Sequence, residues 1–261
     1  MRNPASLMLV MALFSLADCA TPPPASDPEA VADFKQTNDP LEPTNRVLYN
    51  INQGIDAVVL RPLAEGYRYA LPQPVRNATH NALDNLAQPV VISNHILQGN
   101  PRRAGDELMR FVINSTLGLG GFFDPATRLG YPAHSTDFGI TLAEWGVGEG
   151  PYLYLPIIGP SGPRDALGFG IDTAMDPFTW VGQGAVVTDL EYVRYGLFAI
   201  DERERALDDL DAIMKNALDP YATLRSLYRQ HRQSKVVAAS SDEPATVPAW
   251  FPQPEKASPK P

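Results

Sequence analysis

The sequence predicts a mainly α protein built from short amphipathic helices, and three observations support this. Apolar residues recur at helical spacing in successive segments of residues 39–233, which predicts one domain there. Proline supplies 26 of the 261 residues, about twice its usual share, and keeps the apolar segments short. Some segments carry an apolar arc wider than the roughly 100° that a soluble surface helix needs, so they predict a contact beyond one protein core.

Residues 1–18 are typical of a lipoprotein signal peptide. A single Arg2 precedes an apolar run at residues 7–16 that is too short to span a membrane. The run ends in LADC, which looks like a bacterial lipobox, although Asp18 stands where a small neutral residue is usual. Cys19 is the only cysteine, so we expect its thiol to carry the lipid anchor; an ordinary cleaved signal with an incidental cysteine is the alternative. Ala20 after the cysteine favours the outer membrane.

Residues 19–38, rich in Pro, Ala, Asp and Ser, predict a flexible tether. The first helix is expected to start at Thr44 or Asn45 as N-cap and to end or bend at Pro62. One face of this helix is apolar and consists of Val47, Leu48, Ile51, Ile55, Val58 and Val59. The other face is polar but mostly uncharged and consists of Asn45, Asn50, Asn52, Gln53 and Asp56.

Two short helices are expected next, one from Pro74 and one from Pro89 to Gly99. Asn100 then caps a helix that runs to about Leu117. Its polar residues gather on one narrow arc: Arg103, Asp106, Glu107, Arg110 and Asn114. Candidates for contact with lipid lie on or just after the wide apolar remainder: Leu108, Phe111, Val112, Phe122 and Phe123. A buried central helix of a globular bundle is the alternative interpretation.

Residues 142–158 predict a loose hairpin or loop, since proline interrupts an apolar stretch that alternates poorly. Gly146, Gly148 and Gly150 would let its backbone bend, so the loop is a candidate gate. Further helices are expected at 164–175, 185–199, 207–218 and 221–232. Residues 234–261 predict a disordered tail.

A series of short motifs runs in order along residues 39–232. They are DPLEPTNR at 39–46, LPQPVRN at 71–77, NLAQPV at 85–90, LQGNP at 97–101, RFVINSTLGLGGFFD at 110–124, DFGITL at 137–142, WGVGEGPYLYLP at 145–156 and DPY at 219–221. Together they resemble the MlaA family of outer-membrane lipoproteins, also called VacJ. The resemblance covers nearly the whole expected domain.

The resemblance implies a ring-like bundle of helices with a central channel, lying flat in the inner leaflet of the outer membrane. Such a ring admits phospholipids that have strayed into the outer leaflet, passes them to a periplasmic carrier protein and sits against trimeric porins. It also implies that Asn50, Ile51 and Asn52 hold the channel closed. The three loop glycines would hinge the gate, and Tyr152 to Ile157, with Leu155, would form its apolar lip.

The two arginines of the polar arc, Arg103 and Arg110, are candidates for pairing with a headgroup phosphate. Ion pairs with Asp106 and Glu107 on the same helix are the alternative.

Composition argues against several other functions. The formal net charge of −9 argues against a nucleic-acid partner. One cysteine excludes an internal disulfide framework and a cysteine-based zinc site, and Gly118–Gly121 fits no phosphate-binding loop, so we expect neither metal nor cofactor. An exported hydrolase is disfavoured, because GPSG at 159–162 lacks the spacing of a nucleophile elbow. A structural lipoprotein that tethers porins without transporting lipid stays open.

Overall fold

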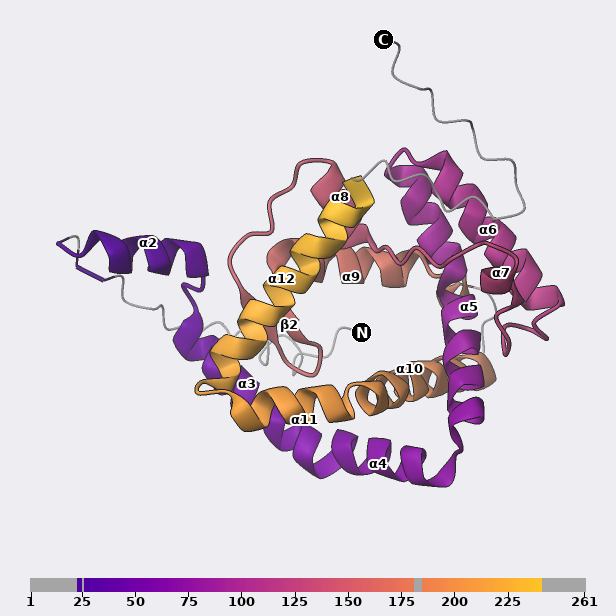
Figure 1. The fold of residues 1–261 in the computed structure, drawn as a ribbon, viewed down its shortest axis with the longest axis horizontal. Coiled ribbons are helices and arrows are strands. Elements are labelled where there is room, and N and C mark those ends of the chain that lie inside the picture. The colour runs from indigo at the N-terminus through magenta and orange to yellow at the C-terminus, as the bar shows by residue number, and fades with distance from the viewer. Residues whose placement is uncertain (1–22, 25, 181–184, 241–261) are drawn as a thin grey trace, which may run out of the picture.

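The computed structural model describes residues 23–24, 26–180 and 185–240. Figure 1 shows its helices arranged as a ring, with α3 and α4 on one side, α5 on the next, α9 opposite α4, and α12 on the remaining side. The prediction of a mainly α, ring-like protein is confirmed. Within the described part of the chain, no helix is both long and apolar enough to cross a bilayer.

The elements follow one another with few long connections. The helices are α2 (Pro28–Thr37), α3 (Glu42–Ile55), α4 (Arg61–Ala70), α5 (Gln73–Leu97), α6 (Pro101–Thr116), α7 (Pro125–Arg128), α8 (Phe138–Glu144), α9 (Pro163–Met175), α10 (Ala185–Arg205), α11 (Leu207–Asn216) and α12 (Pro220–Ser240). A π-helical turn, η1 (Asp56–Leu60), joins α3 to α4, and a 3₁₀ turn, η2 (Pro177–Thr179), follows α9. The strands β1 (Leu153–Leu155) and β2 (Gly159–Ser161) form an antiparallel pair.

Helix α6 has its polar face inside and its apolar face outside. The expected N-cap is confirmed, because the Asn100 side chain accepts a hydrogen bond from the Arg103 backbone N–H at 3.1 Å. The buried residues of the helix are Ala104, Glu107, Arg110, Ile113 and Asn114. Leu108 and Val112 are about half exposed. The narrow polar arc therefore packs against the protein, and the wide apolar arc faces away from it.

Helix α3 shows the same inversion. Its buried residues are Asn45 and Tyr49, whereas Val47, Ile51 and Ile55 are exposed. The exposed apolar face continues through η1, none of whose residues is buried.

Helix α8, which packs against α9, is built in the ordinary sense, with apolar residues inside. Phe138, Ile140 and Leu142 of α8 are buried. The two helices approach so closely that a Cβ at Gly168 of α9 would lie 2.3 Å from the backbone nitrogen of Gly139. Only glycine fits there.

The first and last motifs of the domain meet and close the ring. Asp39 is buried and accepts from the Tyr221 hydroxyl at 2.5 Å and from Arg225 at 2.7 Å. Next to it, the Arg46 guanidinium makes a two-point ion pair with Asp219, at 2.6 and 3.2 Å. We call these contacts the ring clasp. They join the start of α3 to the start of α12.

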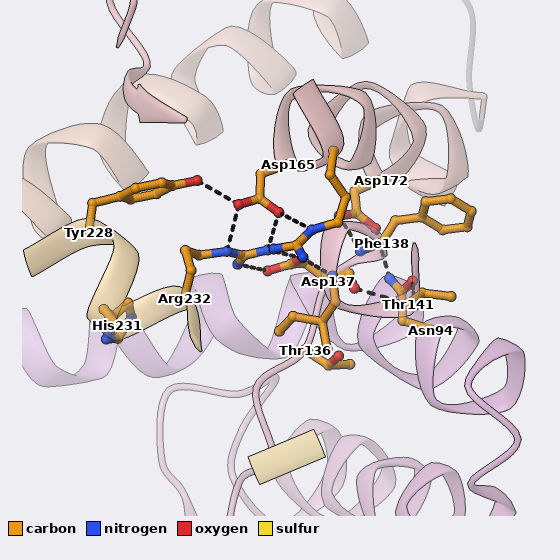
Figure 2. A network of polar contacts seen from close by, with 12 residues as sticks. Asn94, Thr136, Asp137, Phe138, Thr141, Asp165, Asp172, Tyr228, His231 and Arg232 are labelled. Atoms are coloured by element: carbon orange, nitrogen blue, oxygen red, sulfur yellow. Dashed lines mark hydrogen bonds and ion pairs between the residues drawn. The ribbon is translucent and has the colours of Figure 1, made fainter. Parts of the chain in front are cut away.

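A second polar cluster ties α12 to α8 and α9. Figure 2 shows the Arg232 guanidinium between Asp137 and Asp165, with contacts of 2.6–3.0 Å to both carboxylates. The Tyr228 hydroxyl donates to Asp165 at 2.6 Å. Burial alone would raise the pKa of Asp165, but these donors outweigh it and hold the pKa below its usual value. The Asp137 side chain also caps α8.

Several boundaries differ from the predictions. The first helix starts at Glu42 with no side-chain cap, and the two helices expected from Pro74 and Pro89 are one, α5, with Pro89 inside it. A proline lacks only its own N–H, so a long helix held by neighbours on both sides can tolerate one. Residues 142–144, expected at the start of the loose hairpin or loop, instead end α8, for which Asp137 supplies the N-cap.

The expected tether and tail are partly helical. Residues 28–37 form α2, which starts with a proline at the first position and an acidic residue in the first turn. Helix α12 continues to Ser240, beyond its expected end at residue 232. The Arg103 guanidinium donates to the carbonyls of Ala238 and Ala239, and Ser240 bonds Glu144 at 2.6 Å, so this end is docked on α6 and α8.

Candidate site at the hairpin and its cavities

The β1–β2 hairpin forms the centre of the candidate site. Its strands pair Leu153 with Ser161 and Leu155 with Gly159. In Figure 1 it lies on the inner side of the ring, next to α3 and α12. Ile157 and Ile158 at its turn are 76% and 53% exposed, so the tip presents apolar surface.

Asn45 of α3 holds the free edge of β1. Its side-chain amide donates to the Tyr152 carbonyl at 3.1 Å and accepts from the Tyr154 N–H at 2.9 Å. The same NH₂ group donates to Asp39 of the ring clasp at 2.8 Å. The amide therefore pairs with β1 as a neighbouring strand would, and it connects the hairpin to the closure of the ring.

Asn52, two helical turns later, holds the tip of the hairpin. Its amide donates to the Leu155 carbonyl and accepts from the Ile157 N–H, both at 3.0 Å. Of the three residues expected to keep the channel closed, Asn52 is thus the one that contacts the hairpin, whereas Asn50 and Ile51 are exposed. We call Asn45 and Asn52 the asparagine clamp.

A cluster of tyrosines packs beneath the hairpin. Tyr49 of α3 meets Tyr154 and Tyr221 edge-to-face, with ring centroids 5.6 and 5.7 Å apart. Tyr152 packs against Tyr221 at 6.0 Å and is only 2% exposed. Burial raises the pKa of Tyr154 to about 12. Tyr152, expected on the lip of the gate, is buried in this cluster, whereas Ile157 and Ile158 at the hairpin turn are exposed.

Two cavities flank the hairpin, and Ile158 and Pro160 contribute to the lining of both. The larger one, about 350 Å³, lies between the hairpin, α3, η1 and α11, and we call it the inner cavity. The smaller one, about 200 Å³, lies between the hairpin, α9 and α12. Both combine apolar side chains with Asp and Arg residues, so both are amphipathic. A movement of the hairpin would change both at once.

The glycines expected to hinge the hairpin lie in the segment that leads into it. Gly146 and Gly150 have φ values of +86° and +77°, which favour glycine over any other residue. Gly148 has open space around it, with no atom within 4 Å of an added Cβ. Asn38 holds the end of the segment by donating to the Gly150 carbonyl at 2.8 Å. The geometry suits a hinge.

The model of the MlaA lipoprotein family matches residues 37–235. The chain belongs to this family. It is 34% identical to the intermembrane phospholipid transport system lipoprotein MlaA of Haemophilus influenzae, over 90% of this chain and 92% of that one. It is 35% identical to the protein of the same name from Escherichia coli K12, over 76% and 78% of the two chains.

A solved structure supports the same assignment. It comes from work on the structural basis for maintenance of bacterial outer membrane lipid asymmetry, and it superposes on this chain with a TM-score of 0.66. The sequence identity is 32%, and the match covers 76% of this chain and 98% of the other. The domain of this MlaA-family chain is therefore the part that its relatives share.

Arg110, a candidate for pairing with a headgroup phosphate, is bonded to other residues of the protein. Arg110 is buried, and its guanidinium donates to Thr127 at 2.9 Å, to Asp124 at 3.2 Å and to the Tyr131 carbonyl. Glu107 lies 3.5 Å away. The ion-pair alternative thus describes Arg110, although its partners include Asp124 as well as Glu107. Arg103 is used in docking the end of α12.

The residues expected to meet lipid are mostly on the outside. Leu108, Val112, Phe122 and Phe123 are exposed, and Phe111 is half-buried. They come from α6 and the glycine-rich turn that follows it. Cys19, the expected lipid-attachment site, and the expected signal peptide lie outside the described residues.

Sequence reasoning missed two residue pairs at the inner cavity, Arg203 with Asp56 and Arg61 with Asp211. The partners lie 147 and 150 positions apart, so no local spacing could have revealed them. Asn45 was noted only as a candidate N-cap and as part of a polar face. Its distance of seven residues from Asn52 places both amides on the same side of the helix, which is the signal that would have predicted the asparagine clamp.

One group of side chains has metal-ligand geometry. Ligand atoms of His80, Asp201 and Glu202 lie within 4.8 Å of one another. Protein groups already surround the Asp201 carboxylate, however: it accepts from Tyr67 at 3.1 Å and from Arg205 at 3.0 Å, and His80 Nδ1 lies 2.8 Å from it. These protein donors explain why the carboxylate is buried there.

Proposed function

We propose that this chain is an outer-membrane lipoprotein that removes mislocalised phospholipids from the outer leaflet and passes them to a periplasmic carrier, which maintains lipid asymmetry. The single observation that carries the proposal is the inverted polarity of α3 and α6. A protein with apolar faces outside and hydrogen-bonded polar groups inside suits a lipid environment, where backbone groups are paired within helices and side-chain polarity is turned inward. Family membership and the names of the relatives point the same way.

The outer apolar belt would place the ring in the periplasmic leaflet of the outer membrane. Leu108, Val112, Phe122 and Phe123 would contact acyl chains, and a lipidated Cys19 would add a covalent anchor. The porin trimer expected from the family would contact the ring within that leaflet. No covalent chemistry is needed for the transfer, and the chain would act without catalysis.

The hairpin would serve as the gate of the lipid path. The asparagine clamp holds it closed by four hydrogen bonds to its backbone, and its apolar tip faces the inner cavity. Release of Asn52 would free the tip, while Asn45 keeps the base attached to the ring clasp. The glycines before β1 would absorb the change in backbone direction.

Deletion of the gene tests the proposed function. We expect more phospholipid in the outer leaflet and greater detergent sensitivity, both restored by the wild-type chain. Unchanged outer-leaflet composition would refute the proposal.

Gly148→Pro tests the hinge: the variant should fold and yet fail to restore lipid asymmetry, and full restoration would show that the hinge is elsewhere.

A structural lipoprotein that tethers porins is the second candidate, because exposed apolar faces can also bind protein. Mass spectrometry of the chain purified in mild detergent separates the two functions. Copurified phospholipid supports transport, and its consistent absence supports the tether.

A further inference from the structure

The inner cavity has an apolar side and a charged side. The apolar side includes Ile158 of the hairpin and Leu210 and Met214 of α11. The charged side holds two ion pairs, Arg203 with Asp56 and Arg61 with Asp211, whose formal charges sum to zero. A ligand that fits both sides must itself be amphipathic.

Arg203 uses only part of its guanidinium within the protein. Nε donates to one oxygen of Asp56 at 2.7 Å and Nη2 to the other at 2.9 Å. The remaining nitrogen, Nη1, is shielded from solvent and has no hydrogen-bond partner. Its two N–H groups are charged donors without an acceptor, which costs free energy. A ligand would pair with them once a small side-chain shift opens Nη1 to the cavity.

Arg76, Arg110 and Arg194 also have a buried nitrogen without a partner, but none of them lines the inner cavity. Among the described residues that line the inner cavity, Arg203 alone has a buried side-chain polar atom without a partner. Asp56 fixes the orientation of the guanidinium, so Nη1 is pre-positioned. The side chain as a whole is 13% exposed, which leaves a charged hydrogen bond there poorly screened by water.

We propose that Arg203 binds the phosphate of a glycerophospholipid headgroup in the inner cavity. The inference rests on the proposed function and names the residue that recognises the substrate. Guanidinium N–H groups make short, charge-assisted bonds to phosphate oxygens. The second ion pair supplies Asp211 for a cationic substituent on the phosphate, and the apolar side receives the start of the acyl chains. The volume of about 350 Å³ is near the lower end of ligand sites, which suits a headgroup.

Lipid binding by the full-length chain in mild detergent tests the assignment. Asp56→Asn with Arg203→Gln removes both charges together, so neither partner is left unpaired. Arg68→Gln is the matched control, since Arg68 also links α10 to another helix, through Glu204 at 2.7 Å, but lies away from the inner cavity. Native mass spectrometry would measure binding of phosphatidylethanolamine and of diacylglycerol with the same acyl chains.

We expect the double variant to bind phosphatidylethanolamine at least about tenfold more weakly, with diacylglycerol unchanged and the control within about twofold of wild type for both. If the double variant only disturbed the structure, binding of both lipids would fall equally, and this result would overturn the proposal. So would unchanged binding of phosphatidylethanolamine, and in that case the proposed function would stand. If the wild type binds neither lipid, the proposed function fails as well.

Two further measurements complete the test. Inorganic phosphate should compete only weakly; competition as strong as that of the intact lipid would assign the site to a free anion and overturn the lipid proposal. Arg203→Lys keeps the pair with Asp56 and so preserves the fold if the double variant does not fold. It should weaken phosphatidylethanolamine binding by about threefold or more, and wild-type affinity would count against the proposal.

Discussion

Helices α6 and α8 both pack against α5, and they follow opposite rules. Helix α8 buries Phe138, Ile140 and Leu142, as a helix of a soluble domain does. Helix α6 buries Glu107, Arg110 and Asn114 and exposes Leu108, Met109 and Val112. One chain thus contains two kinds of interior.

The difference indicates whether the exposed face of each helix suits water or lipid. Burying polar groups is tolerated where they find partners, and Glu107, Arg110 and Asn114 of α6 each have at least one. Glu107 accepts from the His134 N–H at 2.6 Å, and Asn114 bonds Asp124 at 3.0 Å and the Ala126 N–H at 3.1 Å. The apolar face that remains would be a liability in water but a gain in lipid.

The largest effect is expected at the polar interior of α6. Arg110→Met would leave Glu107 and Asp124 without their cation, and breaking a buried pair in this way costs about 3–5 kcal/mol. Chemical unfolding in detergent measures it. Arg102→Met, on the exposed side of the same helix, should stay within about 0.5 kcal/mol. Equal losses in the two variants would refute the inverted interior.

The next largest effect is expected when an apolar side chain is truncated, and its size should differ between α8 and α6. Ile140→Ala in α8 should cost about 2–5 kcal/mol, because the side chain is 1% exposed and leaves a cavity. Val112→Ala in α6 should cost less than about 1 kcal/mol in the same detergent. A cost at Val112 close to that at Ile140 would mean that protein, not lipid, covers this face.

A smaller effect is expected from charge on the outer belt. In a Cys19→Ser background, Leu108→Asp should leave the unfolding free energy nearly unchanged and weaken flotation with phospholipid vesicles by on the order of tenfold. Gln230→Asp, on an exposed position of α12, is the control and should float like its parent. Undiminished flotation of the Leu108 variant would move the membrane contact to another face.

The smallest effect concerns α5, between the two helices. His95 is buried, and burial holds its pKa below the usual value although its bond to the His134 carbonyl partly opposes this. The unfolded chain then binds the proton more tightly, so stability should fall as pH drops below about 6.5. The difference in unfolding free energy between wild type and His95→Gln should shrink on acidification. A pH-independent difference would contradict the burial argument.

The sequence predicted most helices but not the side each one buries. The excess apolar arc of residues 104–117 was visible from spacing alone, as was its cap at Asn100. Which arc faces inward depends on the surrounding solvent, and residue periodicity does not encode that. The hairpin was expected, but its hydrogen bonds to Asn45 and Asn52 were not, because they join residues more than 100 positions apart.

The same reason explains the arginines. Arg110 lies with its acidic neighbours on the narrow polar arc, and this arc packs against the rest of the protein. Arg203 has no local signature; its partner Asp56 reaches it only when α10 folds back on η1.

The ring clasp sets the order in which parts of the chain can finish folding. Its hydrogen bond between Tyr221 and Asp39 spans 182 positions. Because the chain is synthesised from its N-terminus, Asp39 and the hairpin cannot complete their contacts until helix α12 has been made. Closure of so long a loop depends only weakly on length in equilibrium, at about 0.6 kcal/mol per doubling, but it slows folding. The nascent protein would thus spend the longest part of its maturation as an open arc, with its apolar belt in need of a chaperone.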